Sequence, residues 1–345
     1  MLWLQAYEST LRTPSGLTSF FRGEYHRPVK PGQVFRVVLL AAALLLPLSA
    51  KIPRLVAQDS ETAAIDQISS RIEAGQVDAA AAEARQAVER FPQSSPLHQL
   101  LGAALFKKGS NAEARAAFQR AIQLDPKVAQ NYFNLALVDL SEHKPADAVK
   151  SLEASLQLDP GNAQARVLLG RAYHNLNRTL PAIEQFRNAL KLSPQLPMVH
   201  YHLGFAFQSQ GNLTAALGEY EKEIRQNPNF YEPYWLAGNI ELGRGNLDTA
   251  EALFRQGISL RPQAIEPLYG LARVLVARRQ FAPAEAALRK VIELKPDHVE
   301  AHYALARTYQ QLGKQDAAAK EFKVVADLHA RNSSRKSGIA GSQIQ

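Results

Sequence analysis

The chain has no cysteine among its 345 residues. This absence excludes disulfides, thiolate metal sites, cysteine nucleophiles and a lipid-modified N-terminal cysteine. The sequence also lacks a Gly-x-x-x-x-Gly-Lys phosphate loop, a His-Glu-x-x-His zinc helix and a Gly-x-Ser-x-Gly nucleophile turn. We therefore expect no enzymatic activity, no cofactor and no metal centre.

The central part of the chain lacks an excess of positive charge, although the formal net charge of the whole is +8. Residues 1–57 contain seven Lys or Arg and two Asp or Glu, and residues 331–345 contain three and none. The stretch between them holds 30 residues of each sign. Because a neutral body does not attract phosphate backbones, we expect no nucleic-acid partner.

No uncharged apolar run reaches the length of about 20 residues that a membrane-spanning helix needs. The run at residues 37–50 reads VVLLAAALLLPLSA and is flanked by a basic residue on each side. Its length matches the core of a signal peptide, with cleavage after Ala50 or Ala57. The basic lead before it is long for a signal peptide, so an uncleaved anchor or a buried helix remain alternatives.

With a signal peptide or an anchor, residues 1–57 form a basic N-terminal flank and the remainder of the chain is exported. We then expect a bacterial, exported protein with a periplasmic or other extracytoplasmic location. Residues 37–50 would hold the chain at that membrane if they were not removed.

A period of 34 residues runs without insertion or deletion through residues 61–332. Alanine recurs with this period at 80, 114, 148, 182, 216, 250, 284 and 318. Proline closes seven of the eight blocks, at 92, 126, 160, 194, 228, 262 and 296. A small residue, glycine or alanine, stands at 102, 136, 170, 204, 238, 272 and 306. Such a period indicates a repeat protein whose units bury their apolar faces against one another.

Each block contains two stretches with the apolar spacing of an amphipathic helix. In the block 197–230 the first stretch ends at Gly211-Asn212, and the second ends at Asn227-Pro228. Proline cannot continue the helical hydrogen-bond ladder, so it terminates the second helix. The small residue at 204 and the alanine at 216 allow the two helices to pack closely, which predicts a helical hairpin.

This pattern resembles the tetratricopeptide repeat. The block from 163 to 196 carries it closely, with a large residue, Leu-Gly, an aromatic, an alanine, a second aromatic and a closing proline at Arg166, Leu169, Gly170, Tyr173, Ala182, Phe186 and Pro194. The resemblance implies an all-α fold, a right-handed α-solenoid of eight helix-turn-helix hairpins over residues 61–332. It leaves the client open, because this scaffold serves many partners.

Several blocks depart from the family pattern. The first has Gln67 and Arg71 at usually apolar positions, as expected for a terminal repeat with a polar outer face. Glu223 replaces the small residue of a second helix, so its carboxylate requires a partner or water. The last block lacks its proline, and we expect residues 333–345 to be a disordered polar tail.

In the family, positions 2, 5, 9, 12 and 13 of each repeat face the concave groove. The resemblance therefore implies that position 5 contributes Phe133, Tyr201, Trp235, Tyr269 and Tyr303, and position 9 contributes Arg171, Phe205, Asn239, Arg273 and Arg307. Aromatic and arginine side chains are enriched where protein partners bind. We expect a peptide along this groove, with its carboxylates near the arginines.

An alternative interpretation is that the rings pack against neighbouring first helices and the arginines are solvated or pair with Glu232, Glu266 and Glu300. The grip that chaperone-binding members of the family exert on a terminal carboxylate is not expected, because no lysine stands at position 5. His98, His200 and His302 occupy a position of large residues, so we expect packing roles for them. His298 and His302 lack a third metal ligand.

These observations predict a scaffold that binds a peptide or protein partner in the groove, in or near the cell envelope. Replacing Trp235 and Tyr269 by Ala is expected to weaken binding without unfolding the chain. The alternative is a structural protein that self-associates as a dimer or a stack through the uncapped C-terminal hairpin. We do not expect the third class, an enzyme with a catalytic domain after the repeats, because residues 333–345 are too few to form one.

Overall fold

The computed structural model describes the backbone of residues 52–341 and the side chains of residues 60–331. The apolar run at 37–50 therefore lies outside the described residues. Within them, sixteen α-helices and no strand are found. The chain divides into two compact units, one ending at Leu176 and the other beginning at Asn177, and each unit is described by itself.

The first unit contains seven helices, α2 (Ile52–Glu73), α3 (Val77–Arg90), α4 (Ser95–Lys108), α5 (Asn111–Leu124), α6 (Ala129–Ser141), α7 (Pro145–Leu158) and α8 (Ala163–Asn175). The second contains nine, α9 (Thr179–Leu192), α10 (Val199–Ser209), α11 (Leu213–Gln226), α12 (Glu232–Gly243), α13 (Leu247–Leu260), α14 (Ile265–Ala277), α15 (Phe281–Leu294), α16 (Val299–Gln311) and α17 (Gln315–Gly341).

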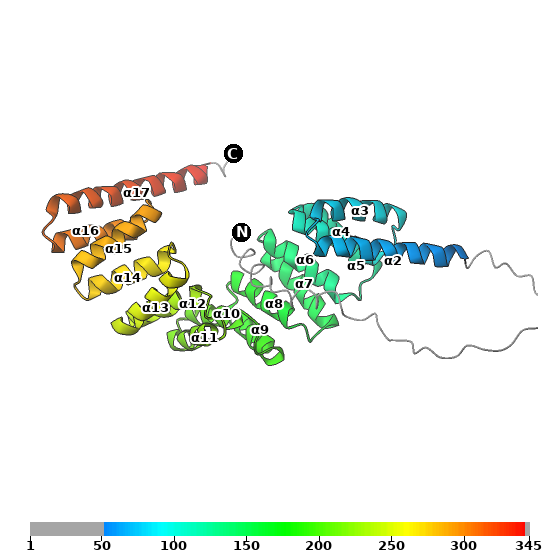
Figure 1. The fold of residues 1–345 in the computed structure, drawn as a ribbon, viewed down its shortest axis with the longest axis horizontal. Coiled ribbons are helices and arrows are strands. Elements are labelled where there is room, and N and C mark those ends of the chain that lie inside the picture. The colour runs from blue at the N-terminus through cyan, green and yellow to red at the C-terminus, as the bar shows by residue number, and fades with distance from the viewer. Residues whose placement is uncertain (1–51, 342–345) are drawn as a thin grey trace, which may run out of the picture. The chain divides into compact units, whose positions relative to one another are not determined.

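Within each unit the helices follow one another as hairpins, for example α4 with α5 and α10 with α11 (Figure 1). This confirms the predicted all-α solenoid class. The periodic alanines of the second helices are the tightest positions of the packing, since each is at most 2% exposed. Second helices end as the prolines predict; α13, for example, ends at Leu260, shortly before Pro262.

The two ends of the repeat array differ from the prediction. Helix α2 begins at Ile52, so the backbone of the predicted flank is helical in its last residues, with Pro53 in the first turn, where proline is tolerated. Helix α17 continues to Gly341, so the backbone of 333–341 is helical where we predicted a tail. The missing proline of the last block explains the continuation, because nothing there interrupts the helical ladder.

Hairpins pair a small residue on the first helix with a large one on the second. A Cβ built on Gly102 would lie 2.7 Å from the ring of Phe118, and one on Gly204 would lie 2.7 Å from Tyr220. Where the first helix carries alanine instead, as at Ala272, the second helix carries Leu288, and both lie in one core cluster. The rings of Phe118, Tyr220 and Phe254 thus lie close against a glycine, as expected in a close-packed interior. The last hairpin differs, because Phe322 stands opposite Ala306 there and is only half-buried.

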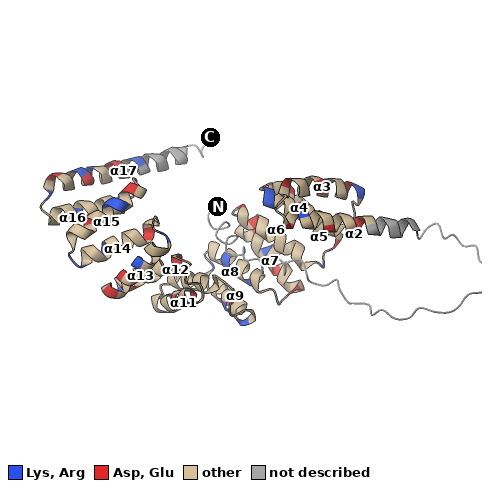
Figure 2. Cartoon of the chain, viewed as in Figure 1, with Lys and Arg blue, Asp and Glu red and all other residues tan. Residues whose placement is uncertain are grey.

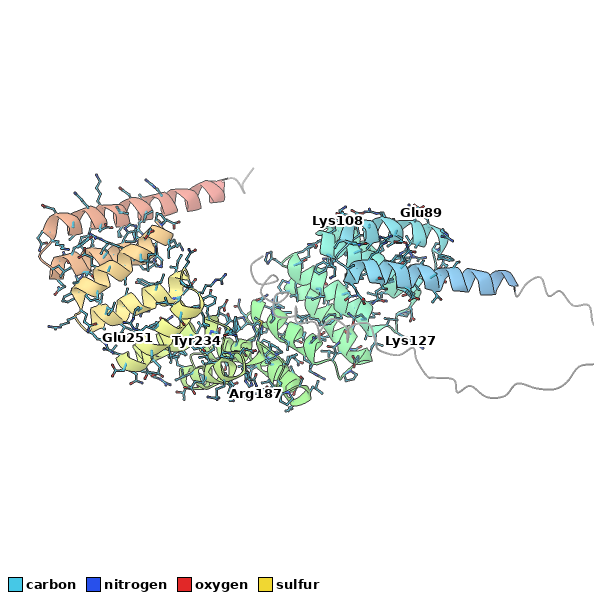
Figure 3. The ribbon with its side chains drawn as sticks, viewed as in Figure 1. Glu89, Lys108, Lys127, Arg187, Tyr234 and Glu251 are labelled. Carbon is cyan, nitrogen blue, oxygen red and sulfur yellow. The ribbon has the colours of Figure 1, made fainter. Side chains whose placement is uncertain are left out.

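A second recurring contact links four of the first helices to the preceding turn. The hydroxyl of Tyr234 (labelled in Figure 3) donates to the backbone carbonyl of Pro228 at 2.9 Å. The same contact to a proline carbonyl six residues earlier is made by His98, Arg166 and His302. The closing proline therefore also presents a carbonyl that anchors the next first helix.

Glu223 on α11 is fully buried, and it has the partners that the sequence required. Its carboxylate accepts hydrogen bonds from the backbone N–H groups of Met198, at 3.0 Å, and Tyr201, at 3.2 Å, and from the amide of Asn227. Met198 precedes α10 in a left-handed conformation with φ of 65°. Glu223 thus caps the first turn of α10 from the neighbouring helix.

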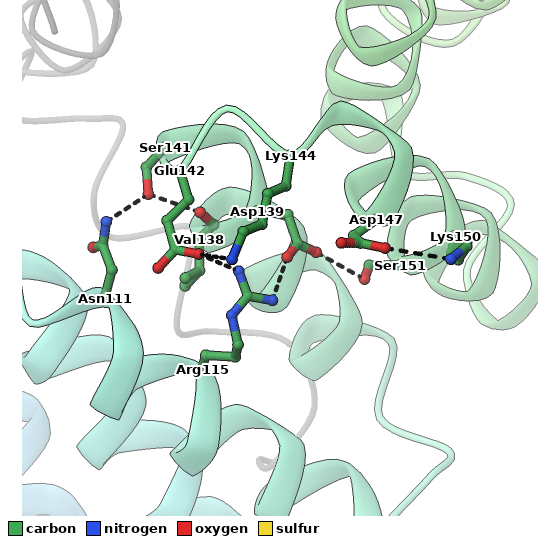
Figure 4. Close-up of polar contacts among 10 residues, drawn as sticks. All are labelled: Asn111, Arg115, Val138, Asp139, Ser141, Glu142, Lys144, Asp147, Lys150 and Ser151. Atoms are coloured by element: carbon green, nitrogen blue, oxygen red, sulfur yellow. Dashed lines mark hydrogen bonds and ion pairs between the residues drawn. The ribbon is translucent and has the colours of Figure 1, made fainter. Parts of the chain in front are cut away.

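Acidic and basic residues are interspersed over the described helices (Figure 2). One network in the first unit joins α5 to the end of α6, where Arg115 binds both Asp139 and Glu142 (Figure 4). The Asp139 side chain is only 1% exposed, and it also accepts a hydrogen bond from Ser151 at 3.2 Å. None of the described helices has the length and apolar character required to cross a membrane.

Candidate functional site

The position-5 rings do not form one uniform ladder. Phe133 on α6 is 3% exposed and lies in a core cluster of the first unit, and Tyr201 on α10 is 6% exposed. Tyr201 contacts the rings of Phe230, at 5.1 Å between centroids, and Phe205. Phe133 and Tyr201 therefore support the fold, and their rings are not open to a partner.

Two other predicted side chains are open. Phe205 on α10 is 40% exposed and stacks on Tyr201 at 6.5 Å. Tyr303 on α16 is 51% exposed and meets Phe322 of α17 edge-on at 5.9 Å. Exposed aromatic rings that are held by a second ring lose little conformational freedom on binding, which favours them as anchors.

Trp235 on α12 is half-buried and packs against the core cluster around Phe254. Its indole N–H is buried and has no hydrogen-bond partner among the described residues. A buried donor without an acceptor costs free energy. Trp235 therefore contributes packing to α12, and truncating it would disturb the core as well as any binding surface.

Arg273, Asn239 and Tyr269 form a linked group on α12 and α14. The guanidinium of Arg273 donates to Oδ1 of Asn239 at 3.0 Å, and lies 6.0 Å from the ring centre of Tyr269. Tyr269 is half-buried, and its ring lies 4.9 Å from that of His298. Burial raises the pKa of the Tyr269 hydroxyl, while the charge of Arg273 lowers it. The hydrogen bond to Asn239 orients the Arg273 guanidinium. The Arg273 side chain is exposed, so its charge faces solvent.

The two other predicted arginines differ from each other. Arg171 on α8, in the first unit, is half-buried and engaged in contacts. Arg307 on α16 is exposed and has no acidic partner in the described part of the chain. Arg273 and Arg307 are both exposed to solvent, as the alternative interpretation allows. No ion pair within the described residues joins either of them to Glu232, Glu266 or Glu300. Glu300 instead approaches His298 at 3.1 Å.

The histidines act within the fold. Nε2 of His302 lies 2.9 Å from the carbonyl oxygen of Pro296, and its Nδ1 lies 2.6 Å from Glu321. His200 makes the matching contact with Glu219 one helix on, at 2.6 Å. Nδ1 of His298 accepts the backbone N–H of Ala301, which caps α16. No cluster of three or more potential metal ligands occurs in the described residues.

Four consecutive stretches of the chain match one family model, described as tetratricopeptide repeat, at residues 65–129, 133–197, 201–265 and 269–333. A second model with the same description matches residues 241–295. The first four matches cover more than half of the chain. The chain belongs to the tetratricopeptide repeat family.

Solved structures share the fold of this tetratricopeptide repeat chain at low sequence identity. They include the APC/C Cut9–Hcn1 hetero-tetramer, with a TM-score of 0.56 and 17% identity over 70% of this chain and 48% of that one. Pseudomonas aeruginosa pilF has a TM-score of 0.54 and 20% identity over 60% of this chain and 94% of that one.

A tetratricopeptide repeat protein from Parabacteroides merdae has a TM-score of 0.54 and 15% identity over 72% of this chain and 99% of that one. These likenesses establish the fold alone. No curated protein sequence matches the chain significantly.

Sequence analysis missed one feature of this tetratricopeptide repeat surface. Glu266, Tyr269 and Arg273 on α14 recur at the same spacing as Glu300, Tyr303 and Arg307 on α16. The signal was present as Glu-x-x-Tyr-x-x-x-Arg, repeated 34 residues apart. The sequence prediction assigned these glutamates only a pairing with the arginines and did not include the repeated motif.

Proposed function

We propose that this protein is an interaction scaffold, and that the first helices of its second unit bind a segment of another protein. The surface consists of the exposed faces of α10, α12, α14 and α16, and we call it the first-helix face. The observation that carries the proposal is the combination of exposed Phe205 and Tyr303 with arginines that no acid neutralises among the described residues. Aromatic rings and arginines dominate the affinity of protein interfaces. The proposal includes no catalytic step.

Affinity capture from cells that naturally produce the protein tests this function. A Phe205→Ala/Tyr303→Ala variant removes the two exposed rings of the first-helix face. A matched control, Leu180→Ala/Leu213→Ala, removes two exposed apolar side chains from the second helices α9 and α11. We expect a partner that the wild type and the control retain and the face variant loses, with unchanged helical circular dichroism. A partner retained by all three would contradict the proposal.

The proposal includes an extracytoplasmic location, supported by the composition of residues 37–50, which lie outside the described structure. A fusion of residues 1–60 to alkaline phosphatase tests it, because that enzyme is active only after export and disulfide formation. We expect activity in the wild-type fusion and loss when Leu44 and Leu45 are replaced by Asp. An inactive wild-type fusion would contradict the export proposal and leave the binding proposal unaffected.

A second candidate function, self-association through the last hairpin, is favoured by one observation. Phe322 on α17 is half-buried, whereas its counterparts in six earlier second helices are at most 1% exposed, at Phe118, Leu152, Phe186, Tyr220, Phe254 and Leu288. Those counterparts pack against a following first helix, which Phe322 lacks within the described residues. Light scattering distinguishes the candidates: a dimer that Phe322→Glu converts to a monomer supports self-association, and a monomeric wild type excludes it.

A further inference from the structure

Two consecutive first helices of the second unit present the same three side chains in the same order. Helix α14 carries Glu266, Tyr269 and Arg273, and α16 carries the same residue types at 300, 303 and 307. Residues spaced i, i+3 and i+7 lie on one face of a helix. Because α14 contacts α16, the two triads lie side by side as a row of acids, a row of tyrosines and a row of arginines. We call this surface the twin triads.

The arginines of the twin triads are oriented without being neutralised. Arg273 donates to the neutral amide oxygen of Asn239 at 3.0 Å and lies 6.0 Å from the ring centre of Tyr269. Arg307 is exposed, and no acidic group within the described chain pairs with it. A guanidinium has five N–H donors in a planar fork, so most donors of both arginines remain open to a carboxylate.

The acids have no lysine or arginine partner among the described residues. Glu266 is exposed and forms no ion pair among the described residues, and the Glu300 side chain is 70% exposed. Glu300 approaches only Nδ1 of His298, and that nitrogen already accepts the backbone N–H of Ala301. The Glu300 carboxylate, 70% exposed, therefore remains accessible to a base on a partner.

Charges on both sides reach the central row of rings. The pKa of Tyr269 is raised chiefly by burial, with Arg273 lowering it and Glu300 raising it. On the preceding helix α12, burial and the charge of Glu266 raise the pKa of Glu232, against the opposing effects of its own backbone and Arg261. Glu266 therefore lies close enough to Glu232 to repel it, and a base on a partner would relieve that repulsion.

We propose that the twin triads bind an extended segment of a partner protein whose side chains alternate between basic and acidic. In an extended chain, successive side chains point to opposite sides, so alternation places every base along one edge and every acid along the other. The acid and arginine rows are seven residues apart on each helix, about 10 Å along its axis. Bases would meet Glu266 and Glu300, acids would meet Arg273 and Arg307, and the backbone would lie over the tyrosines. This inference rests on the proposed function and specifies its partner.

Three fluorescent peptides of twelve residues test the arrangement of charge on the full-length chain by fluorescence anisotropy. They are alternating Lys-Glu, a Lys₆-Glu₆ block of identical composition, and Glu₁₂. We expect the alternating peptide to bind at least about 10-fold more tightly than the block, as four partly exposed ion pairs allow, and to weaken with added salt. Equal binding of the two, or tighter binding of Glu₁₂, would overturn the proposal.

Charge variants locate the binding. Arg273→Glu/Arg307→Glu is expected to abolish the preference for the alternating peptide. The further changes Glu266→Arg/Glu300→Arg are expected to restore the preference, because the peptide can bind with its acidic and basic edges exchanged. Arg255→Glu, at an exposed residue on α13, is the control that leaves binding unchanged. Failure of the swapped variant to recover, while its circular dichroism is unchanged, would overturn the proposal.

The outcome separates this inference from the proposed function. If capture of a partner depends on Phe205 and Tyr303 while the peptides are not distinguished, the scaffold function holds and the alternating-charge specificity is wrong. If capture is also independent of the two rings, both are wrong.

Discussion

A Cβ placed on Gly238 of α12 would lie 2.8 Å from Cε1 of Phe254 on α13. Phe254 is fully buried, and a Cβ on Gly270 of the next first helix would come within 2.2 Å of the same ring. The ring is therefore held between two glycines of consecutive repeats. Because the packing is this tight, the side-chain size that fits at residue 238 depends on the side chain at residue 254.

Gly238→Ala is expected to lower the free energy of unfolding by about 1–3 kcal/mol, because the added methyl overpacks the hairpin. In a Phe254→Leu background the same change should be neutral or stabilising, as at the natural Ala272 and Leu288 pair, since alanine is the better helix former. Urea denaturation of the four variants measures the coupling. Additive effects of the two substitutions would show that the close approach of Gly238 and Phe254 does not limit the packing.

Glu223→Ala is expected to cost about 3 kcal/mol of stability, because it leaves the backbone N–H groups of Met198 and Tyr201 buried without an acceptor. Glu223→Gln keeps one acceptor oxygen and should cost less. Glu221→Ala, at an exposed position of the same helix, should change stability by less than about 0.5 kcal/mol. Chemical denaturation measures all three, and equal effects of Glu221→Ala and Glu223→Ala would refute the capping role.

Arg115→Ala is expected to destabilise the first unit by about 3 kcal/mol, because it leaves the buried carboxylate of Asp139 without its charged partner. Arg85→Ala removes an ion pair with Glu113 in which both side chains are about half exposed, and should cost less than about 1 kcal/mol. Thermal unfolding followed by circular dichroism compares the two. A loss at Arg115 no larger than at Arg85 would mean that Asp139 gains little from the pair.

Stability should fall in acid through Glu219. Burial raises the pKa of this carboxyl, but hydrogen bonds and charge from His200 and Lys222 outweigh it, so the pKa lies below its ordinary value of 4.5. A carboxyl whose pKa is lower in the folded than in the unfolded state stabilises the fold above the unfolded value and loses that effect as the pH falls through the folded one. Wild type should therefore lose more stability than Glu219→Gln between about pH 5 and 3, measured by urea denaturation. Parallel curves would contradict this account.

The repeat architecture could be predicted from the sequence because close helix packing requires the same residue type at the same position of each repeat. The alanines from Ala80 to Ala318 sit where two helices touch, and each is at most 2% exposed. The ends were less predictable, since Ile52 and Gly341 bound helices that no repeat constraint specifies. Beyond the last repeat no proline interrupts the helical hydrogen bonds, so the sequence does not mark where α17 stops.

The surface could be predicted only in part. Position 5 was assigned correctly to the first helices, but its exposure ranges from 3% at Phe133 to 51% at Tyr303. Exposure depends on what packs above each ring. Phe230, the last residue of the same repeat, packs edge-on against Tyr201, and nothing in the periodic pattern marks that contact. The partner of Arg273 was likewise unforeseen, because Asn239 lies one full repeat away.

Site-specific photocrosslinking tests the central claim most directly. A benzoylphenylalanine placed at Tyr303 or at Phe205 reports contacts of the first-helix face, and one placed at Leu180, a 71% exposed residue of a second helix, is the control. After irradiation in the native cells, we predict one protein adduct of the same mass from positions 303 and 205 and none from 180. Adducts from position 180 alone, or equally from all three, would contradict the assignment of binding to the first-helix face.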